Sequence, residues 1–319
     1  MSNKPSNHTE NNNISSPQWR LFDSPYLLLL FTILFWSLNT LLGRAIHGQI
    51  PPIGLAFWRW FCGFLIILIP GYSYVKKDWL TLINHSKIII LLSILGISSF
   101  NTLLYKGLQF TTAINALLVQ SIMPLVVVVI SYLFFQETLS PLQCLGVFIS
   151  FSGAITIIAR GDWHILATLS FNQGDLIILI AVVCYACYSI LLRFRPVIHP
   201  LSFLTVTFAL GAAFLFPLYL WETFTIQRIL LNRVTFLSIG YVGIFPSIIA
   251  YLCYNRGVEL VGANRASLFL HLSPVIGSIM AVFFLKETLQ WFHGLGFVMI
   301  ISGLFLVIRN PSLSPKEYQ

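Results

Sequence analysis

Long apolar stretches alternate with short polar segments along most of the chain. Each stretch is long enough to cross, as one α-helix, the roughly 30 Å of hydrocarbon in a bilayer. The pattern therefore predicts an all-α integral membrane protein with ten transmembrane helices. The predicted spans are residues 26–46, 53–73, 87–108, 112–135, 141–159, 174–194, 202–221, 235–256, 265–286 and 289–309.

The second half of the sequence repeats the first. When residues 107–158 are laid over residues 257–308, fourteen of 52 positions are identical, and they include paired glycines, a paired proline and a shared Glu-Thr-Leu. Each half carries five predicted helices, and an odd number forces the second half to insert upside down relative to the first. We therefore expect two inverted repeats, 26–159 and 174–309, around a shared cavity near the middle of the membrane.

Basic residues indicate the orientation. Eleven Lys and Arg residues fall on the side of the two chain ends and six on the other side, and an excess of basic residues marks the cytoplasmic face. Residues 1–25 are Asn-rich and lack the pattern of a cleaved signal peptide. The sequence thus predicts a disordered cytoplasmic tail at 1–25, a periplasmic connector at 160–173 and a cytoplasmic tail at 310–319 in a bacterial inner membrane.

Composition supports the membrane assignment. The chain is 57% hydrophobic and only 9% charged, whereas soluble domains carry about 25% charged residues. The net charge of +8 comes from scattered residues, so a nucleic-acid partner is not indicated and the bilayer itself is the expected partner. The five cysteines lie inside apolar segments, and the sequence contains neither a metal-ligand motif nor a phosphate-binding Gly-rich Lys loop, so no cofactor is expected.

Several motifs resemble those of the EamA-type branch of the drug/metabolite transporter superfamily. The motifs are Trp36-Ser37-Leu38-Asn39, Arg59, Tyr105-Lys106-Gly107-Leu108, Phe134-Phe135-Gln136-Glu137-Thr138-Leu139 and Leu285-Lys286-Glu287-Thr288-Leu289. The resemblance covers residues 26–309. It implies a secondary transporter that exports small organic metabolites, amino acids among them, by alternating access. The expected partners of such a transporter are its small-molecule substrate and either a coupling proton or an exchanged solute.

Polar and aromatic side chains within the apolar spans are the candidates for the cavity wall. Amides in hydrocarbon are costly without a partner, so they are expected to face protein or a wet cavity. Hydrogen bonding between helices without substrate contact is the alternative at each position. The candidates are Trp36, Asn39, Arg59, Asn101, Tyr105, Gln120, Tyr185, Tyr188, Tyr251, Tyr254 and His271.

Two of these candidates have specific alternatives. Arg59 is a charge inside a predicted span, and it either extends outward to the membrane surface between Trp58 and Trp60 or faces the cavity, where it binds a substrate carboxylate or helix carbonyls. His271 either binds substrate and titrates during transport, or is a neutral imidazole bonded to a neighbouring helix.

Four further residues have structural or gating roles in this interpretation. Pro124 and Pro274 occupy the same repeat position inside helices, and each is expected to bend or open its helix beside the cavity. Glu137 and Glu287 precede threonines in tight turns, where a carboxylate can cap the following helix; ion coupling is the alternative.

A membrane-embedded enzyme, a receptor and a scaffold are the competing function classes. An enzyme would need clustered Asp, Glu, His or Cys at membrane depth, and the predicted interior carries almost no carboxylates. An inverted repeat serves alternating access and has no evident use in a receptor or scaffold. The sequence therefore favours a transporter that is not an enzyme.

Overall fold

The computed structural model describes residues 24–46, 49–111, 113–168, 172–230, 232–285 and 290–309, and every regular element within these ranges is helical. The elements, with η for π- and 3₁₀-helices, are α2 (Pro25–Ala45), α3 (Pro52–Asn84), α4 (Ser86–Leu92), η1 (Ser93–Ser99), α5 (Phe100–Gly107), α6 (Ala113–Ser121), α7 (Met123–Phe135), α8 (Pro141–Ile158), α9 (Trp163–Ala167), α10 (Gln173–Leu191), η2 (Leu192–Phe194), α11 (Pro200–Thr225), α12 (Arg233–Gly243), η3 (Ile244–Ile249), α13 (Ala250–Val261), α14 (Ala263–Leu268), η4 (Phe269–Leu272), α15 (Ser273–Leu285) and α16 (Trp291–Arg309).

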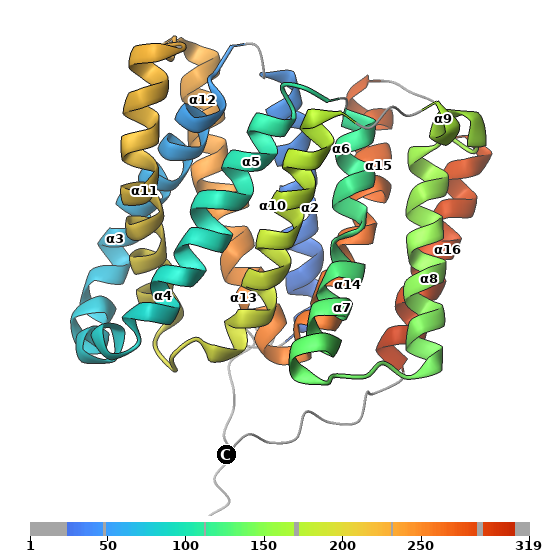
Figure 1. The fold of residues 1–319 in the computed structure, drawn as a ribbon, viewed down its shortest axis with the longest axis horizontal. Helices are drawn as coiled ribbons and strands as arrows, with labels where there is room; N and C mark the ends of the chain where they lie inside the picture. The colour runs from blue at the N-terminus through green and yellow to red at the C-terminus, as the bar shows by residue number, and fades with distance from the viewer. Residues whose placement is uncertain are drawn as a thin grey trace, which may run out of the picture.

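These elements form ten transmembrane helices in two inverted repeats of five, which confirms the predicted fold class (Figure 1). In the described part of the chain, nine helices are long and apolar enough to cross a membrane without interruption. The remaining crossing combines α14, η4 and α15. Residues 1–23 of the predicted N-terminal tail lie outside the described residues. The predicted 310–319 tail and Glu287 also lie outside them.

Contacts between the repeats follow the pseudo-two-fold relation. The first helix of each repeat packs against the third helix of the other, as α2 does with α13 and α10 with α5. The second helices, α3 and α11, pack against each other, and the same holds for the fifth helices, α8 and α16. Figure 1 shows α3 with α11 at one end of the molecule and α8 with α16 at the other, on either side of α2, α5, α10 and α13.

Glycines bring α8 and α16 into backbone contact. A Cβ atom added to Gly146 would lie 2.6 Å from the carbonyl oxygen of Gly303, and one added to Gly153 would lie 2.9 Å from that of Gly296. No side chain larger than hydrogen fits at these distances. The four glycines, which the repeat pairs with one another, therefore set the close approach that their seven-residue spacing predicts.

Helix α3 is longer than the predicted span 53–73. It continues to Asn84 and contains 33 residues, or about 50 Å at 1.5 Å per residue, so its end projects beyond the hydrocarbon. The extension packs on the start of α11. The ring of Tyr74 stacks on that of His199 with centroids 3.6 Å apart, and the Asp78 carboxylate accepts a hydrogen bond from the His199 backbone amide.

Irregular turns occur at matching places in the two repeats. A π-helical segment interrupts the third helix at η1 (Ser93–Ser99) and the eighth at η3 (Ile244–Ile249). The fourth helix breaks at Ile122, and the ninth narrows to a 3₁₀ turn at η4. Pro124 and Pro274 follow these last two breaks, where a proline lacks the N–H that a continuous helix would use. The irregularities flank the centre of the bundle and expose backbone carbonyls there.

Candidate functional site

Arg59 lies in the interior of the bundle and not at its surface. Its side chain is 1% exposed, so outward extension to the membrane surface does not describe this arginine. The guanidinium nitrogen Nη1 donates to the oxygen atoms of three side chains of the first repeat: Asn39 Oδ1 at 3.2 Å, Asn101 Oδ1 at 2.9 Å and the Tyr105 hydroxyl at 2.9 Å.

The second repeat supplies the other partners of the guanidinium. Nε donates to Ser247 Oγ at 2.7 Å, and Nη2 donates to the Pro246 carbonyl at 3.0 Å. Trp36 Nε1 donates to that same carbonyl at 3.0 Å. Both repeats therefore hold one buried cation, and all five of its acceptors are neutral.

The π-helical turn η3 explains why these acceptors are available. Pro246 has no N–H to donate to the Val242 carbonyl, and the Ser247 hydroxyl takes that acceptor at 2.6 Å. The wider turn directs the Pro246 carbonyl sideways into the bundle, where two side chains reach it. The π-helical turn thus provides an acceptor for a charge carried by another helix.

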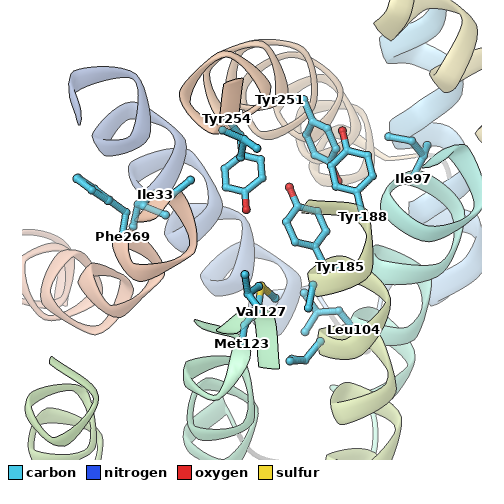
Figure 2. Packing of buried hydrophobic residues seen from close by; sticks show 14 of the residues in the cluster. Ile33, Ile97, Leu104, Met123, Val127, Tyr185, Tyr188, Tyr251, Tyr254 and Phe269 are labelled. Atoms are coloured by element: carbon cyan, nitrogen blue, oxygen red, sulfur yellow. The ribbon is translucent and has the colours of Figure 1, made fainter. Parts of the chain in front are cut away.

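An aromatic cluster adjoins the Arg59 network. It consists of Trp36, Tyr185, Tyr188, Tyr251 and Tyr254, and the four tyrosines are at most 1% exposed. The Trp36 ring lies 5.3 Å from that of Tyr185, 5.7 Å from Tyr251 and 5.0 Å from Tyr254. Figure 2 shows the four tyrosine rings gathered between α10 and α13.

Three of the tyrosine hydroxyls have partners. The Tyr251 hydroxyl donates to the Gly96 carbonyl in η1 at 2.6 Å, and the Tyr188 hydroxyl donates to Asn255 Oδ1 at 2.9 Å. The Tyr254 hydroxyl shares a hydrogen bond of 2.7 Å with the Ser189 hydroxyl. The Gly96 carbonyl in η1 accepts from Tyr251, and the Pro246 carbonyl in η3 accepts from Arg59. In each repeat, a π-helical turn therefore supplies the acceptor.

His271 belongs to a different cluster. It is fully buried in η4, where its Nε2 donates to the Ser121 carbonyl at 3.1 Å and its Nδ1 lies 2.8 Å from Ser150 Oγ. A neutral imidazole satisfies both contacts, because Nδ1 accepts from the serine hydroxyl when Nε2 carries the proton. This geometry matches the interpretation of a neutral histidine that joins helices, and it does not bring His271 to Arg59.

Gln120 and Glu137 also lie outside the central cluster. Gln120 Nε2 donates to the Ala116 carbonyl of its own helix. Glu137 does not cap α8, because Ser140 and Gln143 form that capping box. Its carboxylate instead accepts from Arg193 at 2.6 Å and from Asn264 Nδ2 at 3.0 Å, since the turn that carries it faces the second repeat.

Two carboxylates at helix ends are buried, which the sequence pattern did not predict. Glu222, in the last turn of α11, is 2% exposed and accepts from the backbone amides of Ile53 and Gly54 at the start of α3. Asp175 is also 2% exposed and accepts from the Thr111 hydroxyl and from Asn115. The signal for Glu222 was the Pro51-Pro52 pair, which leaves the next amides of α3 without helical partners.

Comparisons with known proteins follow the same division of the chain. The sequence model of the EamA-like transporter family matches residues 23–159 and 172–309. The uncharacterized transporter YyaM of Bacillus subtilis (strain 168) is 31% identical over 301 residues, which cover 92% of this chain and 97% of that protein. An uncharacterized transporter of Archaeoglobus fulgidus is 24% identical over 290 residues, covering 88% and 96%.

A solved crystal structure has the same fold. It superposes on the chain with a TM-score of 0.70 at 17% identity, and the superposition covers 89% of this chain and 96% of the other. At this identity the likeness concerns the fold alone.

Proposed function

The chain belongs to the EamA-like transporter family, and from that premise we propose that it is a secondary transporter that exports small organic metabolites, amino acids among them, by alternating access. The substrate site is the centre of the bundle, at Arg59 and the adjoining aromatic cluster. The observation that carries the proposal is the sharing of one buried guanidinium by both repeats.

This sharing connects ligand binding to movement between the repeats. A substrate that takes over donors of Arg59 competes with Ser247 and Pro246, which belong to the second repeat. Loss of these bonds weakens one link between the repeats and leaves the first-repeat partners in place. Differential contact of this kind is what allows a ligand to shift a conformational equilibrium.

Contacts at both ends of the bundle support an alternating mechanism. At one end Glu222 joins α11 to the start of α3, and at the other Glu137 joins the α7–α8 turn to Arg193. The central side chains are sealed from solvent, with Arg59 at 1% exposure and Asn101 at 2%. A solute therefore reaches them only when one set of end contacts opens.

We further propose that the protein lies in the inner membrane with both chain ends in the cytoplasm, so that Glu222 is at the periplasmic end and Glu137 at the cytoplasmic end. Proton coupling and solute exchange are the two ways of driving export. Single cysteines placed at residues 310–319 and 226–232 test the orientation. A membrane-impermeant thiol reagent added to intact cells should label only the second segment, and the reverse result would contradict the proposal.

Transport in proteoliposomes tests the function. Vesicles that contain the purified protein are loaded with a radiolabelled mixture of amino acids and organic acids, and efflux is compared with that from protein-free vesicles. We expect Arg59→Lys and Arg59→Ala to lower efflux by about 10- to 100-fold, because lysine cannot reproduce the planar set of donors.

Arg309→Lys is the matched control, because Arg309 is exposed at the end of α16. It should transport like the parent protein. Parent-like efflux in Arg59→Lys, or no efflux of any solute by the parent protein, would contradict the proposal.

A further inference from the structure

We infer that the ligand of the Arg59 site is an organic anion that binds through a carboxylate and needs no ammonium group. The inference rests on the proposed function, because it takes the centre of the bundle as the substrate site. It goes further by stating the charge of the substrate and the group that is recognised. It predicts that an organic acid binds more tightly than the amino acid with the same skeleton.

The first argument is charge. None of the five acceptors around the Arg59 guanidinium is a carboxylate; they are two amides, two hydroxyls and one backbone carbonyl. A buried cation without a counter-charge is expensive, since neutral dipoles compensate only part of its lost hydration. An anionic ligand would supply the missing charge at the place where it is most effective.

The second argument is the balance of donors and acceptors at the guanidinium. Nη2 carries two hydrogens, yet among the described residues its only acceptor is the Pro246 carbonyl, which also accepts from Trp36. Nη1 carries two hydrogens and has three oxygen atoms within hydrogen-bond distance. The Nη2 side is therefore short of an acceptor, and a carboxylate oxygen is the strongest acceptor for a guanidinium.

The third argument comes from a nearby donor without a partner. Among the described residues, Trp60 Nε1 makes no hydrogen bond, and the Trp60 side chain is fully buried. An unpaired buried polar group costs about 1–3 kcal/mol. An indole nitrogen can only donate, so its complement is a ligand that offers an acceptor.

The unpaired donor lies beside the charge, because the guanidinium carbon lies 4.7 Å from the centre of the Trp60 ring. An ammonium group carries only donors and a positive charge, so it would not satisfy this donor and would be repelled by Arg59.

The aromatic cluster provides the surface for the rest of the ligand. The rings of Trp36, Tyr185, Tyr251 and Tyr254 offer flat apolar faces next to the guanidinium. The face of an aromatic ring could attract an ammonium group by about 0.5–2 kcal/mol, but no carboxylate takes part in the hydrogen bonds of these residues. The geometry thus favours an acid with an apolar body over a zwitterion.

Binding of matched compounds to the purified full-length protein in detergent tests the inference. The aromatic set is 3-phenylpropanoate, 3-phenylpropanamide, 3-phenylpropylamine and phenylalanine; the aliphatic set is butanoate, butanamide, butylamine and 2-aminobutanoate. Calorimetry and tryptophan fluorescence give the dissociation constants. In at least one set the acid should bind about tenfold or more tightly than its amide, its amine and its amino acid.

Two variants separate recognition of charge from general damage to the protein. Arg59→Lys should weaken binding of the acid by about tenfold or more. Asn101→Asp keeps the size of the side chain and places a carboxylate against the guanidinium, so it should abolish binding of the acid and remove the preference over the amine. Arg309→Lys should bind like the parent protein.

Each contrary result is decisive for the inference. Equal binding of acid and amide, tighter binding of the amino acid, or failure of both acids to bind would overturn it. Arg59-dependent efflux of an uncharged solute, or faster Arg59-dependent efflux of an amino acid than of its matched acid, would also overturn it, although the proposed transport function would stand. If the parent protein transports no solute at all, the proposed function fails first.

Discussion

The two repeats contribute opposite chemistry to the same centre. In the first repeat Asn39, Asn101 and Tyr105 surround a guanidinium, whereas in the second repeat the corresponding helices bring tyrosines together. Asn39 aligns with Tyr188 when Trp36 is laid over Tyr185.

The third and eighth helices differ at two such positions when Gly107 is laid over Gly257. Asn101 aligns with Tyr251, which is the same exchange, and Tyr105 aligns with Asn255, which is the opposite one. The scaffold therefore keeps its symmetry while different residues at equivalent positions place both amide partners of Arg59 in the first repeat and the four clustered tyrosines in the second. A site between inverted repeats can gain a charge and an apolar surface in this way without any change of fold.

The largest difference is expected between Asn39→Leu and Tyr188→Phe, which occupy equivalent positions. Asn39 Oδ1 accepts from Arg59 and from the Tyr105 hydroxyl at 2.8 Å, so Asn39→Leu should lower the free energy of unfolding by about 3 kcal/mol. Tyr188→Phe loses only the bond to Asn255 and should cost about 1 kcal/mol. Denaturant titration in detergent measures both, and equal losses would remove the asymmetry between the halves.

Close contact between the repeats can be tested at Gly96. A Cβ atom there would overlap three atoms of the Tyr188 ring, so Gly96→Ala should destabilise the protein by about 2 kcal/mol. Gly240→Ala is the control, because a Cβ atom at Gly240 would meet nothing within 4 Å. It should leave stability unchanged or raise it by up to about 1 kcal/mol. A neutral Gly96→Ala would show that the ring can move aside.

Removal of single hydroxyls compares the two halves more finely. Tyr105→Phe breaks the bonds to Asn39 and Arg59 and should cost about 1–2 kcal/mol of unfolding free energy. Tyr185→Phe removes a hydroxyl with only a weak contact to Tyr251 and should change stability by less than about 0.5 kcal/mol. Thermal unfolding of the two variants gives the comparison. A larger loss of unfolding free energy in Tyr185→Phe than in Tyr105→Phe would contradict the prediction.

The smallest effect on stability is expected at the ion pairs near the membrane surface. The Glu137 and Arg193 side chains are 31% and 30% exposed, so Glu137→Gln should cost less than about 1 kcal/mol, and high salt should reduce the difference. Glu259→Gln breaks the pairs with Arg195 and Arg256 and serves as the control within one repeat. Only Glu137→Gln should alter the rate of efflux, because only that pair joins the two repeats.

The sequence alone determined the ten spans, the inverted repeat and the presence of one arginine inside an apolar stretch. Each follows from a local property, namely the length of a hydrophobic run, the identity of residues at a constant shift, or one charge in apolar surroundings. The family resemblance followed from motifs of the same local kind.

Only the tertiary structure decided which residues meet. The pairing of Arg59 with Pro246 and Ser247, the contact of Glu137 with Arg193 and the docking of the α3 extension on His199 all join distant parts of the chain. In a membrane, helix faces that touch lipid are as apolar as faces that touch protein, so the hydrophobic pattern reveals where a helix crosses but not how it is rotated. Rotation and axial position are set by packing among helices, and they brought the polar side chains together.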